Sequence, residues 1–529
     1  MTPQPRTPTV GLVSLVGAGP GDPQLITLRG ADCLREAEVV IYDHLAHPAL
    51  LDYCPPDAER VNAGKAAGKH TLSQDAIERL MLARARAGRR VVRLKGGDPY
   101  LFGRGGEEGE ALARAGIPFE VVPGVTSAVA VPAYAGIPLT HREHASSVAI
   151  VTGHEDPSKP SSQLHWPALA KSADTIVCLM GVRQLPEMVK QLLAHGRASS
   201  TPCAVIEWGT LPRQRTITGT LATIAPLAKR AKLEPPAICI VGDVVRLRAR
   251  LNWFEARPLF GRRVLVTRPL AEARGLAESL ARAGADVVTL PAIEALPLED
   301  YSLLDQAIRH MDSYHWLFFT SAVGVQYFFR RLAHLQRDVR ALAGMRLGVV
   351  GPKTAQALRK LGLRVDFVPT DTRQEGMITE LLPETVHGQR ILIARAEQAR
   401  DVLPEGLKRM GAAVEVVPVY RTVPPPSFAE RLAALEPAVG PTIVTFTSSS
   451  CVRHLWEALP PAQRKAFFAR VITASIGPVT SATLREHKLP VHVEAPTATI
   501  EALTQAIVAH VRAPKRAPAR RGAAARASR

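Results

Sequence analysis

Short β-branched runs alternate with amphipathic helical segments through the first part of the chain. The pattern predicts strands at Gly11–Val16, Val39–Tyr42 and Val91–Leu94, and helices at Leu25–Ala37 and Asp75–Ala87. Strands that alternate with helices of this length are typical of βαβ units, in which each helix returns the chain to the same end of the sheet. The pattern therefore predicts an α/β fold with a largely parallel sheet.

The second half of the chain repeats itself. A new strand is predicted at Val264–Thr267, after a boundary near Asn252–Gly261. VLVTRPLAEARGLAESLARAGADVVTLP (264–291) aligns with ILIARAEQARDVLPEGLKRMGAAVEVVP (391–418), FTSAVGVQYF (from 319) with FTSSSCVRHL (from 446), and GPKTAQALRKLG (from 351) with GPVTSATLREHK (from 477). The shift is 127 residues for the first two pairs and 126 for the third. A nearly constant shift predicts two similar α/β lobes.

Composition excludes several classes of protein. The chain has 529 residues, of which 46% are hydrophobic and 22% charged, as in ordinary globular domains. No apolar run reaches the roughly 18 residues needed to span a bilayer, and the N-terminus has no signal-peptide pattern. The six cysteines are scattered without a C-x-x-C pair, which favours a reducing, cytoplasmic location. We expect no membrane partner.

The net charge of +18 points to an anionic partner. Residues 511–529 contribute seven Lys/Arg and no acid, which leaves +11 (18 − 7) on the rest of the chain. This Ala/Arg/Pro-rich tail is predicted to be disordered. Because only 5% of residues are aromatic, platforms for stacking bases are scarce, and we expect no specific nucleic-acid partner. A small polyanion fits the charge better.

A Gly-rich loop, VGAGPGDPQLITLRG (16–30), follows the first strand. Gly17 and Gly19 fit a dinucleotide fingerprint, and Asp43 stands where a ribose-binding acid would. However, Asp22 occupies the place of the third glycine, and Pro20 removes a backbone donor. From these residues alone, a tight strand-to-helix turn and an NAD-binding oxidoreductase both stay open.

Further motifs carry a family resemblance. VVRLKGGDPYLFGRGGEE (91–108), VVPGVTSAVAVPAYAGIPLTHR (121–142), PPAICIVGDVVRLRARLNWF (235–254) and GKAAGKH (64–70) join the first loop. Together they resemble uroporphyrinogen-III C-methyltransferases, over a domain that we place at residues 10–257. The resemblance implies a two-lobed tetrapyrrole-methylase fold, S-adenosyl-L-methionine as the cofactor and a homodimer.

The same resemblance assigns site residues. Asp43 matches the proposed general base and Lys65 the proposed acid, with the role of a pure carboxylate anchor as the alternative for Lys65. The implied cofactor contacts are Pro20, Gly96, Gly97, Asp98, Leu101, Thr126, Ser127, Met180 and Gly209. Glycines allow close backbone approach to a ligand, Asp98 can accept a hydrogen bond from ribose or amine, and Met180 offers soft apolar area. Leu179 and Tyr100 depart from the usual Tyr and Phe, without removing a group that methyl transfer needs.

Residues 262–510 resemble uroporphyrinogen-III synthase. The resemblance rests on Arg268-Pro269, the two FTS segments, the two GP-x-T segments and VPVYRT (417–422). It implies one lobe at about 262–292 plus 423–510 and another at 295–418, with linear hydroxymethylbilane as substrate. It also implies Tyr420 as the residue that helps the hydroxyl depart, with Ser448 and Thr480 contacting substrate. A degenerate, non-catalytic synthase half is the alternative.

Arginines and histidines complete the candidate residues. Arg104, Arg142 and Arg213 could clamp the carboxylates of a tetrapyrrole. The pairs His44/His47 and His141/His144 have H-x-x-H spacing, but no Cys or acid cluster accompanies them in the sequence. We therefore predict no metal site.

Overall fold

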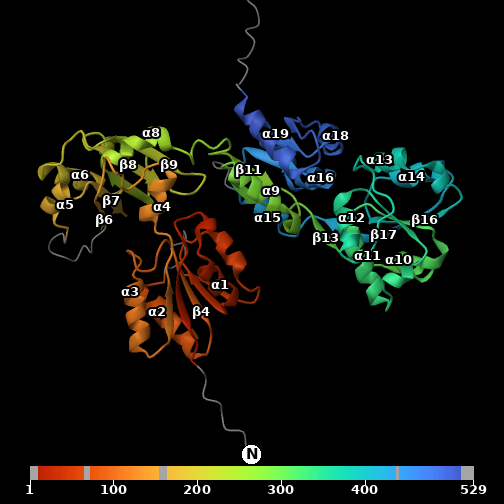
Figure 1. Cartoon of the computed structure of the whole chain (residues 1–529), viewed down its shortest axis with the longest axis horizontal. Helices are drawn as coiled ribbons and strands as arrows, with labels where there is room; N and C mark the ends of the chain where they lie inside the picture. The colour runs from red at the N-terminus through yellow and green to blue at the C-terminus, as the bar shows by residue number, and fades with distance from the viewer. Residues whose placement is uncertain (1–9, 65–71, 154–163, 436–439, 514–529) are drawn as a thin grey trace, which may run out of the picture. The chain divides into compact units, whose positions relative to one another are not determined.

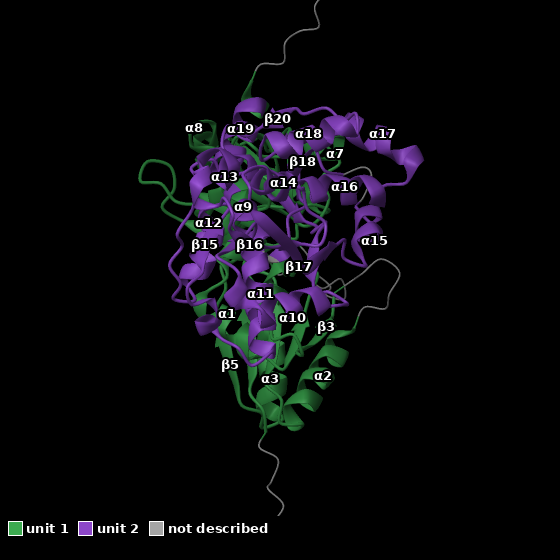
Figure 2. Cartoon of the chain, turned by 90° about the vertical axis from the view of Figure 1, so that its right-hand side faces the viewer, with its two compact units in different colours: residues 1–262, 280–286, 511–529 green, residues 263–279, 287–510 purple. Residues whose placement is uncertain are grey.

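The computed structural model describes residues 10–64, 72–153, 164–435 and 440–513 (Figure 1). The chain divides into two compact units, shown in Figure 2. Unit 1 comprises residues 1–262, 280–286 and 511–529, and unit 2 comprises residues 263–279 and 287–510. None of the helices in the described ranges is long and apolar enough to cross a membrane.

Unit 1 begins with a five-stranded sheet in the order β3-β2-β4-β1-β5, in which every neighbouring pair is parallel. The strands are β1 (Val13–Gly17), β2 (Val39–Tyr42), β3 (Glu59–Asn62), β4 (Val91–Lys95) and β5 (Phe119–Val122). The associated helices are α1 (Leu28–Glu36), α2 (Gln74–Arg86), α3 (Gly105–Arg114) and α4 (Ser127–Tyr134), with short 3-10 turns η1 (Pro23–Leu25) and η2 (Pro48–Tyr53). β1 and β4 are buried along their whole length, as expected for central strands covered on both faces.

The predicted elements of this sheet are confirmed, with later starts for the first strand, at Val13 in place of Gly11, and for the first helix. The helix expected from Leu25 begins at Leu28 instead, because the Thr27 side chain accepts a hydrogen bond from Gly30 N and caps it. Before the cap, Asp22 starts the separate turn η1. The cap and the turn leave the Gly-rich loop longer than the hydrophobic pattern predicts.

The largely parallel sheet predicted from residues 11–94 is confirmed by the first sheet, and the second sheet of unit 1 is mixed. Its order is β6-β7-β10-β8-β9, and only β6–β7 is parallel. The strands are β6 (Val148–Thr152), β7 (Thr175–Leu179), β8 (Pro202–Glu207), β9 (Arg215–Thr220) and β10 (Ala237–Val241). The helices are α5 (Trp166–Ser172), α6 (Leu185–Ala194), α7 (Ile224–Arg230), η3 (Asp243–Leu247) and α8 (Arg248–Leu251). A strand run predicts burial but not direction, because direction depends on where each connection crosses the sheet.

Unit 2 has two five-stranded sheets. The first, β12-β11-β18-β19-β20, uses β11 (Arg263–Val266), β12 (Asp286–Thr289), β18 (Ile443–Phe446), β19 (Ile472–Ser475) and β20 (Val493–Glu494). The second, β13-β17-β16-β14-β15, uses β13 (Glu294–Leu296), β14 (Trp316–Phe319), β15 (Arg346–Val349), β16 (Arg390–Ala396) and β17 (Ala413–Val423). β13 pairs antiparallel with the end of β17, which is the longest strand at 11 residues.

Helices of unit 2 follow the strands. They are α9 (Leu270–Arg282), α10 (Ser302–Arg309), α11 (Ala322–His334), α12 (Pro352–Arg359), α13 (Gln374–Glu380), α14 (Val402–Arg409), α15 (Phe428–Ala433), α16 (Ser449–Ala458), α17 (Pro461–Arg470), α18 (Pro478–Glu486) and α19 (Ile500–Arg512), with short turns η4 (Met311–Ser313), η5 (Val339–Leu342) and η6 (Pro383–Thr385). α19 extends two residues into the tail for which disorder was predicted, since its apolar face packs through Leu503 and Ile507. Residues 514–529 lie outside the described ranges.

The internal repeat reappears in the sheet order. β11, β12, β18 and β19 occupy one sheet as β12-β11-β18-β19, and their repeat counterparts occupy the other as β17-β16-β14-β15. Each repeat gives two strands to each sheet, so neither repeat forms a sheet alone. One repeat copy is therefore not an independent lobe.

Candidate functional site

Backbone-to-backbone contacts join three loops at the carboxyl ends of β1, β4 and β5. Gly19 and Gly97 exchange hydrogen bonds, with Gly97 N donating to Gly19 O at 2.7 Å and Gly19 N to Gly97 O at 3.2 Å. A Cβ added to Gly17 would lie 2.5 Å from Gly124 Cα, and one added to Gly124 would lie 2.2 Å from Gly97 O. No side chain fits at Gly17 or Gly124, which are therefore required by close approach, whereas Gly19 and Gly97 have positive backbone φ values of 79° and 70°, a conformation that favours glycine.

Asp98 fixes the loop after β4. Its carboxylate accepts hydrogen bonds from Tyr100 N at 2.8 Å, Leu101 N at 3.1 Å and Gly124 N at 3.1 Å. An ionised carboxylate offers about four lone-pair positions, and three are occupied here. Its described partners are backbone donors that hold the loop, and its contact with a cofactor stays a prediction.

Helix α4 brings several predicted cofactor residues together. Thr126 caps it by accepting a hydrogen bond from Ala128 N at 3.2 Å. A Cβ on Gly97 would lie 3.8 Å from Ser127 N, so the loop after β4 passes the start of α4. On the side of the helix, a Cβ on Gly209 would lie 2.2 Å from Val131 Cγ1. The first turn of α4 therefore presents N–H groups without intrahelical partners between these loops.

Met180, Leu101 and Pro20 are the remaining predicted cofactor residues. Leu101 packs against the hydrophobic cluster around α4, while Pro20 is half-buried in the loop after β1. Met180 follows β7, is 47% exposed and has a backbone φ of +55°. Such a φ is strained for a side chain other than glycine, and strain of this kind gathers at ligand sites.

Left-handed backbone marks this region more widely. Among the described residues, eight other than glycine have positive φ, and five of them lie in the loops after β4, β7 and β8. These five are Phe102, Arg104, Met180, Trp208 and Thr210. The sequence gives no sign of this strain, because none of the five is a residue type that favours positive φ.

Asp43 lies at the end of β2 with a defined orientation. Its carboxylate accepts from Leu45 N at 3.0 Å and from Gly96 N at 3.3 Å. A Cβ on Gly96 would lie 2.7 Å from Leu45 Cβ, so glycine is needed for this approach. Lys65 lies outside the described residues. The preceding Gly64 is described, and a Cβ there would lie 2.5 Å from His44 N, so the chain that leads to Lys65 passes beside Asp43.

A buried ion cluster lies on β4 and α3, next in sequence to Gly96. Glu108 is fully buried and lies 2.9 Å from Lys95 Nζ and 3.1 Å from Arg93 Nε, with both cations 4% exposed. Burial, followed by the charge of Arg93, lowers the pKa of Lys95. Two cations thus share one carboxylate. The sequence analysis missed this cluster, although charges at alternate positions of a buried strand were a visible signal.

Asp22, the residue that departs from the dinucleotide fingerprint, links the loop after β1 to two other elements. Its carboxylate accepts from Tyr134 Oη on α4 at 2.9 Å and from Gln24 N at 2.9 Å, and its own N–H donates to Thr210 Oγ1 at 3.0 Å. Burial and the Asp22 charge raise the pKa of Tyr134. A carboxylate held here would repel a pyrophosphate, which counts against the NAD interpretation.

The predicted carboxylate clamps have different surroundings. Arg104 is exposed and forms an ion pair with Glu107 at 2.5 Å. The guanidinium of Arg213 lies 3.6 Å from the centroid of the Trp208 ring, at the loop after β8. Arg142 is exposed on the turn between α4 and β6. Arg104 and Arg213 are thus pre-positioned by partners, and their role toward substrate stays a prediction.

The turn that bears Arg142 also holds a cluster of potential metal ligands. His141, Glu143 and His144 have ligand atoms within 4.8 Å of one another, so the acid that we found lacking beside the H-x-x-H pair is Glu143 itself. However, His141 Nδ1 already accepts from Glu143 N at 3.2 Å, and the two imidazoles stack at 4.8 Å. The absence of a metal site at this turn stays a prediction.

In unit 2, Tyr420 on β17 has a defined hydrogen-bond partner. Its hydroxyl lies 3.2 Å from Ser321 Oγ, at the start of α11. Ser321 Oγ accepts from Gly324 N at 2.9 Å, so its own hydrogen is available for the Tyr420 oxygen. Burial raises the pKa of Tyr420, while the Ser321 hydrogen bond acts in the opposite direction. Sequence reasoning missed Ser321, although it is the repeat counterpart of Ser448.

Ser448 and Thr480 were both predicted to contact substrate. Ser448 caps α16 by accepting from Cys451 N at 3.3 Å and is half-buried. Thr480 is only 3% exposed, on the inner face of α18. The helix starts at Pro478, which turns the residue two positions later inward. Its contact with substrate stays a prediction.

Comparison with known proteins follows the division seen in the chain. The family model for tetrapyrrole (corrin/porphyrin) methylases matches residues 12–225, and the model for uroporphyrinogen-III synthase HemD matches residues 274–505. The porphyrin biosynthesis protein HemD of Ruminiclostridium josui is 40% identical over 414 residues, which cover 78% of this chain and 82% of that protein.

Two further relatives match the first half. The S-adenosyl-L-methionine-dependent uroporphyrinogen III methyltransferase of Methanosarcina barkeri is 56% identical, over 45% of this chain and 93% of that protein. The crystal structure of uroporphyrin-III C-methyl transferase from Thermus thermophilus with S-adenyl homocysteine is 42% identical, covers 45% of this chain and all of its own, and has a TM-score of 0.39. The chain is thus a fusion belonging to two families, with a tetrapyrrole methylase in its first half and a uroporphyrinogen-III synthase in its second.

Proposed function

We propose that the first half methylates uroporphyrinogen III at C2 and C7 with two S-adenosyl-L-methionine molecules, which gives precorrin-2. The main support is sequence identity. The chain is 56% identical, over nearly the whole of that relative, to a methyltransferase whose name states this cofactor and this substrate. The second half closes hydroxymethylbilane to uroporphyrinogen III with inversion of the last pyrrole. One half then makes what the other consumes.

The residues around α4 fit this cofactor. N–H groups at the start of α4 suit a carboxylate, since the helix N-terminus carries partial positive charge. Leu101 and the exposed Met180 offer apolar area for an adenine or a thioether. Gly96 and Gly97 keep the loop after β4 free of side chains. When bound, S-adenosyl-L-methionine supplies an electrophilic methyl group on a sulfonium.

Asp43 acts as the general base in this proposal. Two backbone donors hold its carboxylate, and the residue is half-buried, so one side remains accessible to a macrocycle. Removal of a pyrrole proton makes the attacking carbon electron-rich, and a positioned carboxylate is suited to that step. Lys65 and the arginines 104 and 142 bind substrate carboxylates. Alignment of the two reactants contributes more than proton transfer, because methyl transfer needs an in-line approach.

Tyr420 acts as the acid in the second half. It donates its proton to the departing hydroxyl of hydroxymethylbilane, which leaves as water and gives an N-protonated azafulvene beside the Tyr420 phenolate, and the proton released after ring closure returns to that phenolate. Ser321 donates to the Tyr420 oxygen and stabilises the charge that develops there. Ser448 and the start of α18 then contact substrate carboxylates. The azafulvene closes through a spiro intermediate that inverts the last ring.

The functional domains that we propose are 10–257 for methylation and 262–510 for cyclisation, with a tail at 511–529. The protein acts in the cytoplasm and forms a homodimer through its first half. Size-exclusion chromatography with light scattering tests the dimer: a monomer mass of 57.0 kDa at micromolar concentration would refute it.

One experiment tests both halves. Purified protein receives hydroxymethylbilane with or without S-adenosyl-L-methionine, and products are followed by absorbance and mass. We expect uroporphyrinogen III without the methyl donor and precorrin-2 with it. Uroporphyrinogen I at the spontaneous rate would refute the synthase and favour a degenerate second half. Failure to methylate supplied uroporphyrinogen III would refute the methyltransferase.

A further inference from the structure

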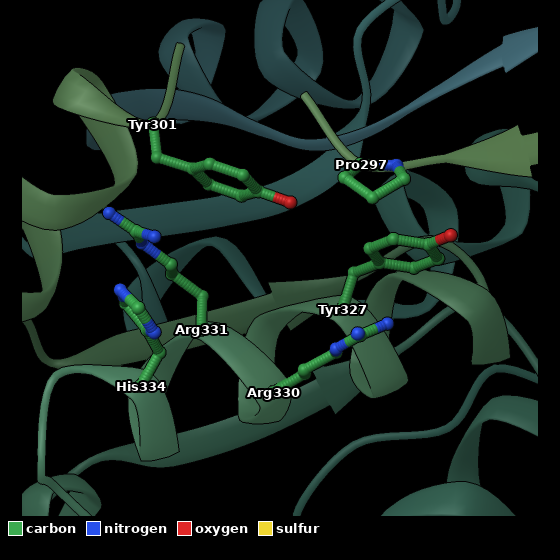
Figure 3. Close-up of a pocket in the computed structure, with 6 residues that line it drawn as sticks. All are labelled: Pro297, Tyr301, Tyr327, Arg330, Arg331 and His334. Carbon is green, nitrogen blue, oxygen red and sulfur yellow. The ribbon is translucent and has the colours of Figure 1, made fainter. Parts of the chain in front are cut away.

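A cavity of about 180 Å³ opens on the second sheet of unit 2, between α10, α11 and the segment after β13 (Figure 3). Two tyrosine rings and a proline form its walls, and three basic side chains from the last two turns of α11 lie along one side. Its lining residues are Pro297, Tyr301, Tyr327, Arg330, Arg331 and His334. The volume admits one small ring or one short acidic side chain, and not a whole tetrapyrrole.

The polar groups of this cavity differ in what they already bind. Arg331 is committed, because it forms an ion pair with Asp305 at 2.5 Å and stacks on the Tyr301 ring at 4.4 Å. Tyr327 Oη donates to Ala295 O at 2.8 Å. By contrast, Tyr301 Oη accepts from Leu298 N at 3.3 Å, which leaves its hydrogen free to donate.

Two polar side chains remain available at the mouth. Arg330 and His334 are exposed, and neither forms a hydrogen bond or ion pair with the described residues. Each side chain extends from α11 beside the cavity in Figure 3. A hydroxyl donor at the wall and an unengaged guanidinium at the mouth are donors that a carboxylate requires, and arginine suits a carboxylate best because it can bind both oxygens.

The cavity adjoins the proposed acid. The Tyr327 ring, which forms one wall, stacks on the Tyr420 ring with centroids 5.6 Å apart. Tyr420 in turn contacts Ser321 at the start of the same helix. A group seated in the cavity is therefore separated from Tyr420 by one aromatic ring.

We infer that this cavity is a subsite for one carboxylate-bearing pyrrole substituent of the open-chain tetrapyrrole, with Arg330 and Tyr301 as its ligands. The inference rests on the proposed synthase function. An acetate or propionate held here would anchor the chain while the hydroxymethyl end lies at Tyr420. Arg330 acts on binding and is not a catalytic residue.

The test compares two charge-removing variants of the full chain. Arg330→Gln removes the free cation of the cavity, and Arg359→Gln removes an exposed cation on α12 of the same lobe, outside the cavity lining. We expect Arg330→Gln to raise the KM for hydroxymethylbilane about five-fold, the upper value for one exposed ion pair, with kcat within about two-fold. Tyr301→Phe, which keeps the ring, should raise KM less.

A binding measurement without turnover separates this inference from the proposed function. Saturation-transfer NMR on the full chain uses a monopyrrole carrying one acetate and one propionate as the probe, with sodium acetate as the second ligand. We expect signal transfer from wild type to the monopyrrole, reduced transfer from Arg330→Gln, and no competition by equimolar acetate.

The outcomes divide as follows. An unchanged KM in Arg330→Gln, or an equal rise in Arg359→Gln, overturns the subsite, because then only the general field of the lobe matters. Acetate that competes as well as the monopyrrole also overturns it, since the cavity would take any free carboxylate. If wild type fails to cyclise hydroxymethylbilane, the proposed function falls. In that case the monopyrrole experiment alone tests the subsite. Signal transfer that depends on Arg330 supports carboxylate binding in the cavity, and absent transfer overturns it.

Discussion

The candidate sites in the two halves of the chain are formed by different kinds of atoms, backbone atoms in the first half and side-chain atoms in the second. In the methylase half, Gly17 and Gly124 lie so close to neighbouring backbone that no Cβ fits, and Gly19 and Gly97 join two loops by backbone hydrogen bonds with positive φ. In the synthase half, the candidate site consists of side chains, chiefly Tyr420 and Ser321, on elements that occur twice. A site made of backbone atoms requires glycine at fixed positions, so it is visible in the sequence as long motifs. A site made of side chains constrains only a few residues, so its sequence motifs are short.

The comparison predicts its largest effect for a glycine in the methylase half. Gly124→Ala places a Cβ 2.2 Å from Gly97 O, so the loops after β4 and β5 must separate. We expect methylation to fall about 100-fold, since displacement of a positioning loop by ~1 Å costs that much. Product rates for both reactions are measured on one preparation. Gly106→Ala is the control, because a Cβ there meets nothing within 4 Å. Equal activity of the two variants would remove the packing argument.

A side-chain site should respond to loss of one atom. Tyr420→Phe removes the proposed proton donor, and we expect the kcat of cyclisation to fall about 100-fold, as for general acids, with methylation unchanged. Tyr314→Phe is the matched control, because its hydroxyl bonds Glu415 in the same sheet. Stopped-flow absorbance of uroporphyrinogen III formation measures both. A kcat of cyclisation equal to that of wild type in Tyr420→Phe would show that Tyr420 is not the proton donor.

Ser321 and Ser448 test whether repeated elements have diverged in role. Ser321→Ala should lower the kcat of cyclisation about 10-fold, because the Tyr420 oxygen loses its donor. Both alanine variants lose a helix cap and should lose about 1 kcal/mol of unfolding free energy. Denaturant unfolding and steady-state kinetics give the two quantities. Ser321→Thr keeps a hydroxyl and should restore turnover. If it does not, hydrogen bonding to Tyr420 is not the cause.

Asp22→Gly completes the dinucleotide fingerprint of the first loop. It therefore tests whether the sequence motif alone is enough to bind NAD. The variant loses the acceptor of Tyr134 Oη, so we expect a loss of about 1–3 kcal/mol in unfolding free energy. Calorimetry should show weaker S-adenosyl-L-methionine binding and still no NAD binding. Asp22→Asn, which keeps an acceptor, should lie closer to wild type. NAD binding by the glycine variant would revive the oxidoreductase interpretation.

The smallest effect concerns pH. Burial lowers the pKa of His47, which starts η2 by accepting a hydrogen bond from Ala49 N. A lowered folded-state pKa means that the stabilisation is complete above the unfolded value of about 6.5 and is lost as pH falls through the folded value. Unfolding free energy measured at pH 7.5 and pH 5 should fall less in His47→Asn, which keeps an acceptor. An equal fall in both would exclude His47 as a source.

Individual residues show where prediction from sequence succeeded and where it stopped. The helix at α2 and the strand β2 were predicted to within a residue, because burial on one face imposes the period of the pattern. The mixed direction of the second sheet was not, since strand direction depends on how the connections cross. Thr480 was predicted to contact substrate, which stays a prediction, and the structure shows its side chain buried on the inner face of α18. Its motif specifies a helix start and not which way the helix is turned.

The sequence alone determined which two families the chain joins and the near-constant shift of its repeat. These properties depend on the order of residues along the chain, so they can be recognised without knowing which segments become neighbours in space. Only the tertiary structure decided that each repeat is divided between two sheets. It also decided that the Asp98 carboxylate accepts hydrogen bonds from backbone N–H groups, and that Asp22 forms hydrogen bonds with α4 and with the loop after β8. It also paired Ser321 with Tyr420, 99 residues apart. Such pairings depend on which strands become neighbours, and burial of the whole core selects those neighbours.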